Sequence, residues 1–409
     1  MKPAISRRFP LIARPRPACT PLDQRVADIQ ERADLALQRR DVAAATAVFN
    51  LAALLASDCG IPGLARAWCH RLAAVALTHD SEPRHALEPV VNLARLHIRA
   101  GDGLAAWTLL EALFHAVDTG TDTTIDGLVL PAARLTDTPD VHARTRRWLW
   151  TVLLGTGAHA LATAGRWDEA SLRLAQYKGV GARMLDGRQI TVIAHSTAGR
   201  YQQARAVLDS THPGEPWEQA VTTCLYLHVP AGNSAERLTA ALTAYHALQP
   251  TNPGLTVFHT RLGLTLLDVL DAAQPESESI AMALIRNATN DGYTARDLLA
   301  HQRCSSIATS RQIGLLTNLV SACGLDHGTI STANLDHLNH ALDKAESVIT
   351  PQAFAALMTR WATSTVSTCR SPDRRVHRIP QPAQFSPPPP QPPRAINRSA
   401  SNPREQATG

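Results

Sequence analysis

Hydrophobic positions recur at helical spacing along most of the chain from residue 23 onward. The first stripe consists of Val26, Ile29, Ala33, Ala36 and Leu37, which lie on one face of a helix of 3.6 residues per turn. Short breaks rich in Gly, Pro and Asp separate this stripe from the ones that follow. No segment shows a convincing alternation of the kind a β-strand requires. The pattern therefore predicts an all-α fold.

The predicted helices differ in how clearly their ends are marked. Thr350 precedes Pro351, a good N-cap followed by proline at the first helical position, and Asp291-Gly292 marks a turn. We expect helices over residues 23–39, 42–57, 64–78, 84–100, 104–118 and 141–164, then over 255–273, 277–289, 294–308, 310–322, 332–348 and 351–366.

Composition divides the chain further. Residues 119–140, rich in Thr, Asp, Gly and Pro, predict a long loop, part of which packs down through Ile125, Leu128, Val129 and Leu130. The predicted organisation is a flexible basic arm (1–22), N-terminal helical hairpins (23–118), the loop (119–140), a repeat region (141–250), a C-terminal helical region (254–369) and a disordered Pro/Arg-rich tail (370–409).

A motif with a period of 34 residues lies in the middle of the chain. G-R-W-D-E-A begins at Gly165, and G-R-Y-Q-Q-A begins at Gly199. A weaker copy, G-N-S-A-E-R, begins 33 residues later at Gly232. Each copy lies between two helix-like stretches. We therefore predict that each Gly is the break between the two helices of a hairpin.

This spacing, with its Gly-x-aromatic-x-x-Ala core, resembles the tetratricopeptide repeat. The strong resemblance covers about 75 residues, and a looser one covers most of residues 23–250; the style is that of helical-repeat proteins common in high-GC actinobacteria. It implies an α-solenoid whose hairpins share a spine through Trp167, Ala170, Tyr201 and Ala204, with Leu174 and Leu208 as large apolar neighbours. The third copy departs from the pattern at Ser234 and Arg237, so Arg237 is expected to point outward.

The resemblance also implies a concave groove that holds an extended peptide. The groove-facing positions would be His159, Asp186, Gln189, Ser196, Gln219, Thr222 and Tyr226, together with Gly155 and Thr163. They form a mixed polar surface without lysine. The alternative interpretation is that they are solvated positions on an exposed helix face.

Charge is concentrated at the ends of the chain. The net charge is +5, but residues 1–22 and residues 370–409 each carry +5, which leaves −5 for residues 23–369. A second candidate site is the basic patch of Arg144, Arg146 and Arg147 beside Trp148 and Trp150. It could stack on nucleobases or bind an acidic partner; alternatively, it is a solvated helix start with buried tryptophans.

Motifs for catalysis or cofactor binding are missing. The Gly-rich stretch from Lys178 to Arg183 follows a helix rather than a strand, so we predict an inter-repeat turn. His337 and His340 lie one turn apart, near Asp336, Asp343, Cys323 and His327, but without a standard zinc spacing. We therefore expect no metal, no cofactor and no enzymatic activity.

These observations favour a non-enzymatic helical-repeat interaction protein that binds a peptide or protein partner in regulation or complex assembly. One alternative is a regulator that contacts nucleic acid through its basic tails, and another is an enzyme with an all-helical pocket. Seven scattered cysteines and the lack of a long apolar segment favour reduced thiols, no membrane partner and a cytoplasmic location.

Overall fold

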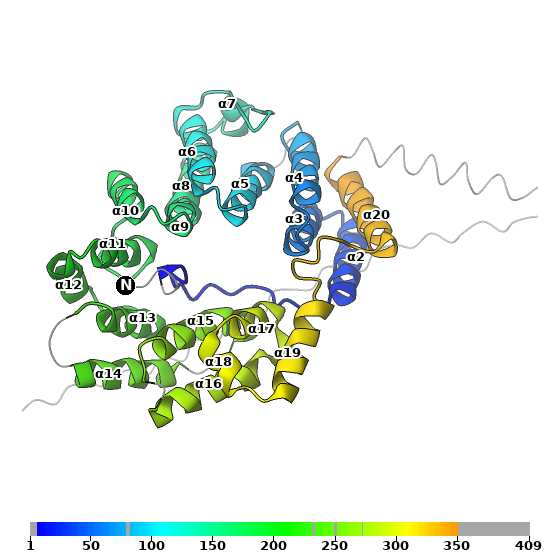
Figure 1. Ribbon diagram of the computed structural model, residues 1–409. Helices are drawn as coiled ribbons and strands as arrows, with labels where there is room; N and C mark the ends of the chain where they lie inside the picture. The colour runs from blue at the N-terminus through cyan, green and yellow to red at the C-terminus, as the bar shows by residue number, and fades with distance from the viewer. Residues whose placement is uncertain (1–5, 79–81, 231–233, 249–251, 272, 351–409) are drawn as a thin grey trace, which may run out of the picture. The chain divides into compact units, whose positions relative to one another are not determined.

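The computed structural model describes residues 6–78, 82–230, 234–248, 252–271 and 273–350. Helices account for most of these residues (Figure 1), so the prediction of an all-α fold is confirmed. The β-structure within the described ranges is one hairpin, in which β1 (Thr123–Ile125) pairs antiparallel with β2 (Leu128–Leu130). No helix in these ranges is long and apolar enough to cross a membrane.

The helices of the first half follow the predicted ranges to within a few residues. They are α2 (Leu22–Arg39), α3 (Val42–Asp58), α4 (Pro62–Ala76), α5 (Pro83–Arg99), α6 (Gly103–Thr119), the short α7 (Ala132–Leu135), α8 (Pro139–Val152), the π-helical turn η1 (Leu153–Gly157) and α9 (Ala158–Thr163). The single helix predicted over residues 141–164 is therefore α8, η1 and α9 in succession.

The second half contains α10 (Trp167–Gln176), α11 (Asp186–Thr197), α12 (Tyr201–Asp209), α13 (Pro216–Leu227), α14 (Ser234–Ala247), η2 (Pro253–Leu255), α15 (Thr256–Leu267), α16 (Pro275–Asn287), η3 (Ala288–Asn290), α17 (Gly292–Leu299), α18 (Gln302–Ile307), α19 (Ser310–Ala322) and α20 (Thr332–Ile349). The helix predicted over residues 294–308 is two helices, α17 and α18. The helix predicted over residues 351–366 and the predicted tail at 370–409 lie outside the described residues.

The two best copies of the repeat have the same local geometry. Gly165 and Gly199 adopt φ values of +74° and +73° between α9 and α10 and between α11 and α12. Only glycine adopts this region without a steric cost. The second helix of each pair then begins at Trp167 and at Tyr201, 34 residues apart. The predicted helix breaks are therefore confirmed at both glycines.

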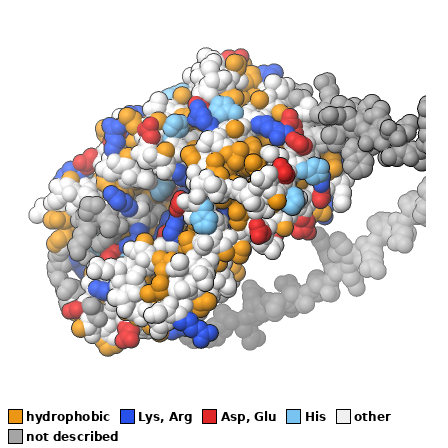
Figure 2. Space-filling model, turned by 45° about the vertical axis from the view of Figure 1, so that its right-hand side comes forward, with side chains coloured by type: hydrophobic (Ala, Val, Ile, Leu, Met, Phe, Trp, Pro, Cys, Tyr) orange, Lys and Arg blue, Asp and Glu red, His pale blue; other side chains and the backbone are white. Residues whose placement is uncertain are grey.

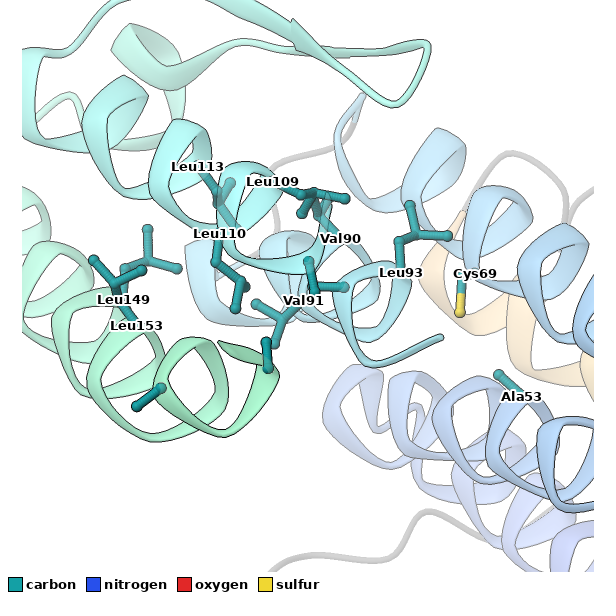
Figure 3. Packing of buried hydrophobic residues seen from close by; sticks show 14 of the residues in the cluster. Ala53, Cys69, Val90, Val91, Leu93, Leu109, Leu110, Leu113, Leu149 and Leu153 are labelled. Atoms are coloured by element: carbon teal, nitrogen blue, oxygen red, sulfur yellow. The ribbon is translucent and has the colours of Figure 1, made fainter. Parts of the chain in front are cut away.

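Consecutive helices bury their apolar faces against each other. Figure 3 shows this packing where Val90 and Val91 of α5 meet Leu109, Leu110 and Leu113 of α6, with Leu149 and Leu153 from α8 and η1 beside them. Trp167, Ala170, Leu174, Ala204 and Leu208 of the repeat motif are buried in the same core.

Tyr201 does not belong to this core, contrary to the prediction. Its side chain is 38% exposed at the first residue of α12. A tyrosine there keeps its hydroxyl in water, so no buried polar group needs a partner. Arg237 is also placed differently: it does not point outward but donates to the carbonyl of Val229 at 3.2 Å and lies over the ring of Tyr226.

Helix α20 returns to the N-terminal hairpin. It packs against α2 and α3, far away in sequence, and buries Leu338, Ala341 and Leu342 in the main core. Helices α15 to α19 instead surround a smaller apolar cluster of their own. The predicted C-terminal region is therefore divided between two clusters.

The predicted loop at 119–140 contains the β-hairpin and α7. Ile125 and Leu130 are buried as expected, and Leu128 is half-buried. Val129 lies on the opposite side of its strand and is 70% exposed, because successive residues of a strand face opposite ways.

Candidate functional site

Residues 6–21, for which the composition predicts a flexible arm, are packed against the helices. Figure 1 shows this segment (blue) passing between α9 and α11 on one side and α15 and α17 on the other. Phe9 and Leu11 are only 1% and 2% exposed. Burying two such side chains stabilises the docked segment by a few kcal/mol, about 1.5–3 each. We call residues 6–21 the docked segment.

Gln189 of α11 binds the backbone of the docked segment. Its Oε1 accepts a hydrogen bond from the Leu11 N–H at 2.7 Å, and its Nε2 donates to the Leu11 carbonyl at 2.9 Å. The same Nε2 donates to the carbonyl of Met184 at 3.1 Å, and the side chain is fully buried. Both contacts with Leu11 are made to its backbone, so this clamp holds the docked segment without contacting the Leu11 side chain through a hydrogen bond.

Two arginines of the docked segment pair with acids of the helices. The Arg14 guanidinium donates to Asp186 at 2.7 Å, and Arg8 pairs with Asp268. His301 also contacts Asp268, at 3.3 Å. Burial disfavours the ionised form of Asp268, but the contacts with His301 and Arg8 outweigh burial and lower the pKa of this carboxyl to about 2. Asp268 is therefore a fixed negative charge at neutral pH.

The second half of the docked segment is held by backbone groups and by the start of α17. The Arg16 N–H donates to the Gly254 carbonyl at 3.0 Å, and the Cys19 carbonyl accepts from the Gly292 N–H at 2.8 Å. The Cys19 N–H donates to the carboxylate of Asp291 at 3.2 Å. Backbone contacts therefore hold this half of the segment as well.

Gly155 of η1 leaves room for the docked segment. A Cβ at Gly155 would lie 3.1 Å from the Arg14 guanidinium, which is tighter than ordinary van der Waals contact. His159, one turn further on, lines the same cavity as Arg14 and Arg16. Burial, and then the charges of Arg261, Arg16 and Arg14, lower the pKa of His159 to about 4. His159 is therefore neutral at pH 7.

Four of the nine predicted groove positions meet at the docked segment, namely Gly155, His159, Asp186 and Gln189. Thr163 is exposed and donates to the His159 carbonyl at 2.8 Å. The remaining four lie elsewhere. Ser196 and Thr222 are buried and donate to carbonyls of their own helices at 2.8 and 2.7 Å, Gln219 is exposed, and Tyr226 donates to Asp209 at 2.7 Å. The composition of residues 6–21 predicts a flexible arm and not a docked segment. The apolar pair at Phe9 and Leu11, among prolines and arginines, was the signal of docking.

The predicted basic patch lies on the exposed face of α8. Arg146 pairs with Asp118 and lies 5.8 Å from the ring centroid of Phe114, whereas Arg144 and Arg147 are exposed. Trp150 is half-buried and donates from Nε1 to the Tyr177 carbonyl at 2.9 Å. Basic and acidic side chains are interspersed on the face drawn in Figure 2.

The other predicted elements have structural surroundings. The stretch from Lys178 to Arg183 connects α10 to α11, as predicted for a turn, and Arg183 pairs with Glu218. Asp343 of α20, which follows His337 and His340 in sequence, accepts a hydrogen bond from Arg71 at 2.7 Å. Across the part of the chain that the structure describes, no group of three or more His, Cys, Asp or Glu side chains is placed to hold a metal ion.

Comparison of the chain with protein-family models, with curated proteins and with solved structures finds no match in any of the three. The function is therefore inferred from the geometry of the docked segment and its surroundings.

Proposed function

We propose that this chain is a non-enzymatic helical-repeat interaction protein, with tetratricopeptide-like hairpins in its central region, that binds an extended peptide segment of a partner. The binding surface is the one now covered by residues 6–21. The observation that carries the proposal is the paired hydrogen bonding of the buried Gln189 amide to the backbone of Leu11.

The clamp supports peptide binding because its chemistry is general. Any extended residue except proline offers the same N–H and carbonyl that Leu11 offers to Gln189. Asp186 and Asp268 add acidic positions on either side of the clamp, where they pair with Arg14 and Arg8. A partner segment with basic residues on either side of an apolar one has the same chemistry as the docked segment.

The docked segment would compete with such a partner. A tethered segment acts at an effective concentration of about millimolar, so a free peptide must bind considerably more tightly, or the segment must first be released. The chain would thus respond to a partner by exchanging one peptide for another. On this proposal, the protein acts in regulation or complex assembly.

The test uses the full chain and a fluorescent peptide of residues 6–21. Leu11→Pro in the chain removes the N–H that bonds Gln189 and should release the docked segment around the clamp. We expect the peptide to bind this variant at least tenfold more tightly than the wild type, as measured by fluorescence anisotropy.

The control for this test is the double variant Leu11→Pro, Gln189→Met, which releases the segment but removes the clamp. Its peptide affinity should fall back toward the wild-type level. Equal affinity of the peptide for all three proteins would refute the proposal. Circular dichroism and thermal unfolding establish that each variant is folded.

The nucleic-acid alternative remains a second prediction. Arg8 and Arg14 of the basic arm are engaged by acids of the helices, and the basic tail lies outside the described residues. Among the described residues, no contact favours nucleic acid over peptide.

A further inference from the structure

A cavity of about 500 Å³ lies between the docked segment and helices α5, α9 and α15. Six arginines and His159 line it, but Asp186 is the one acidic residue among the described residues that do so. Residues 23–369 as a whole carry more acidic than basic residues. The concentration of positive charge in this cavity therefore does not follow from composition.

Four of the six arginines have carboxylate partners. Arg8 and Arg14 pair with Asp268 and Asp186 as described above. Arg99 donates to Asp58 at 2.7 Å, and Arg261 donates to Asp297 at 2.9 Å. Asp58 is shared, because it also accepts from Arg25 at 2.6 Å. These four arginines are therefore paired with carboxylates and help to form the wall of the cavity.

The remaining two arginines, Arg16 and Arg95, have no carboxylate partner among the described residues. Arg16 comes from the docked segment, and its guanidinium lies 5.9 Å from the centroid of the Tyr293 ring. Arg95 comes from α5 and donates to the amide oxygen of Asn92 at 2.6 Å. Glu88 of the same helix offsets the charge of Arg95 only from a distance.

The side chains of Arg16 and Arg95 are both exposed, so water reaches each guanidinium group in part. Partial burial, and for Arg16 then the neighbouring Arg261, still lower the pKa of both groups, against the opposing effects of Asp291 on Arg16 and of Glu88 on Arg95. His159 experiences the same environment and stays neutral. An anion in the cavity would relieve this charge repulsion.

We infer that this cavity is a binding site for a small polyanionic ligand bearing phosphate groups, with Arg16 and Arg95 as its principal contacts. Arginine presents a planar fork of N–H donors that matches phosphate oxygens in bidentate fashion. Two guanidinium groups without a paired carboxylate offer one positive charge for each phosphate of a pyrophosphate unit, which is more than a single carboxylate requires.

The size and lining of the cavity indicate the rest of the ligand. A volume of about 500 Å³ is in the range of pockets that hold a ligand of nucleotide size. Val257 and Phe258 of α15 line the same cavity and offer apolar surface beside the arginines. We therefore assign nucleotide-like phosphates as the ligand class. This inference does not depend on a peptide partner, because the docked segment stays in place and supplies Arg16.

The experiment is isothermal titration of the full chain at low salt with pyrophosphate and with adenosine triphosphate. We expect saturable binding of at least one of them, and a loss of at least tenfold in affinity in the double variant Arg16→Gln, Arg95→Gln. The matched control is Arg144→Gln, Arg147→Gln on the exposed face of α8, which removes the same charge and should leave binding unchanged.

A second measurement uses the wild-type protein. Bound anion should raise the pKa of His159, which proton NMR follows through the imidazole signal with and without pyrophosphate. No saturable binding of either phosphate probe at millimolar concentration would overturn the inference. So would equal weakening in both double variants, or binding of a poly-glutamate peptide in preference to both phosphate probes.

Discussion

Replacing Gln189 with Met tests the clamp directly. The substitution keeps the length and nearly the volume of the side chain but removes both its acceptor and its donors. The two hydrogen bonds to Leu11 and the one to Met184 are lost together. We expect the docked segment to detach around Leu11 while the helices stay folded.

The magnitude follows from the number of bonds and from their burial. A neutral hydrogen bond contributes about 1 kcal/mol net, and each buried group left without a partner costs about 1–3 kcal/mol. Loss of the Leu11 contacts therefore costs on the order of 3–5 kcal/mol if the segment stays in place. Detachment lets water satisfy the freed groups, so the observed cost should be nearer the lower value. At 1.4 kcal/mol for each factor of ten, this raises the equilibrium constant for detachment of the docked segment at least a hundredfold.

Hydrogen exchange measured by mass spectrometry or NMR is the assay. The Leu11 amide should exchange at least a hundredfold faster in Gln189→Met than in the wild type. The Cys19 amide, held separately by Asp291, should change much less. Gln219→Met is the matched control, because Gln219 was predicted to line the same groove but is exposed. Unchanged protection of Leu11 in Gln189→Met, or equal loss in both variants, would refute the reasoning.

Three further predictions concern acid, backbone and thiols. The pKa of His159, lowered to about 4 chiefly by burial, lies below its value near 6.5 in the unfolded chain, so between these pH values the unfolded chain binds more protons than the folded one. The free energy of unfolding should therefore fall by up to about 3 kcal/mol as the pH drops from 7 to 4. His159→Gln should flatten this pH dependence, as measured by urea unfolding. Gly199→Ala should destabilise by about 1–2 kcal/mol because of its left-handed φ, whereas Gly314→Ala, within α19 and with open space at the Cβ, should stabilise slightly in the same assay. The Sγ atoms of Cys323 and Cys19 lie 2.7 and 3.2 Å from the position that a Cβ at Gly292 would occupy, and are therefore close to each other. A two-electron oxidant such as diamide should join these two thiols. Peptide mapping without reductant checks this, and absence of the cross-link at full oxidation of both thiols would contradict the proximity.

Local signals in the sequence predicted the helices and the repeat. Helical periodicity and the glycine breaks are properties of neighbouring residues, so the ends of most helices and the 34-residue spacing between Trp167 and Tyr201 could be read directly. The same spacing led to Gln189, Asp186 and His159. The spacing did not place Ser196 correctly. Successive residues of a helix point in directions about 100° apart, so an error of one residue exchanges a groove position for a core position.

Long-range contacts left no such signal. Nothing in the apolar stripe of residues 332–348 indicates that α20 packs against α2 and α3 rather than against its neighbours in sequence. The Pro/Arg-rich composition of residues 6–21 predicts flexibility because it describes the isolated segment. Phe9 and Leu11 become buried only because the helices provide a complementary surface.

The contacts of the docked segment separate affinity from specificity. Gln189 bonds only the backbone, so it favours any extended segment equally. Phe9 and Leu11 flank Pro10, and both side chains are buried. Arg8 and Arg14 pair with acids beyond this apolar pair, and pairs of this partly exposed kind contribute about 0–1 kcal/mol each. The clamp and the apolar pair should thus supply most of the affinity, and the acids should select among segments. A partner segment of the form basic–apolar–x–apolar–x–x–basic would satisfy all of these contacts at once, and loss of Asp186 should weaken the discrimination between partners more than the binding itself.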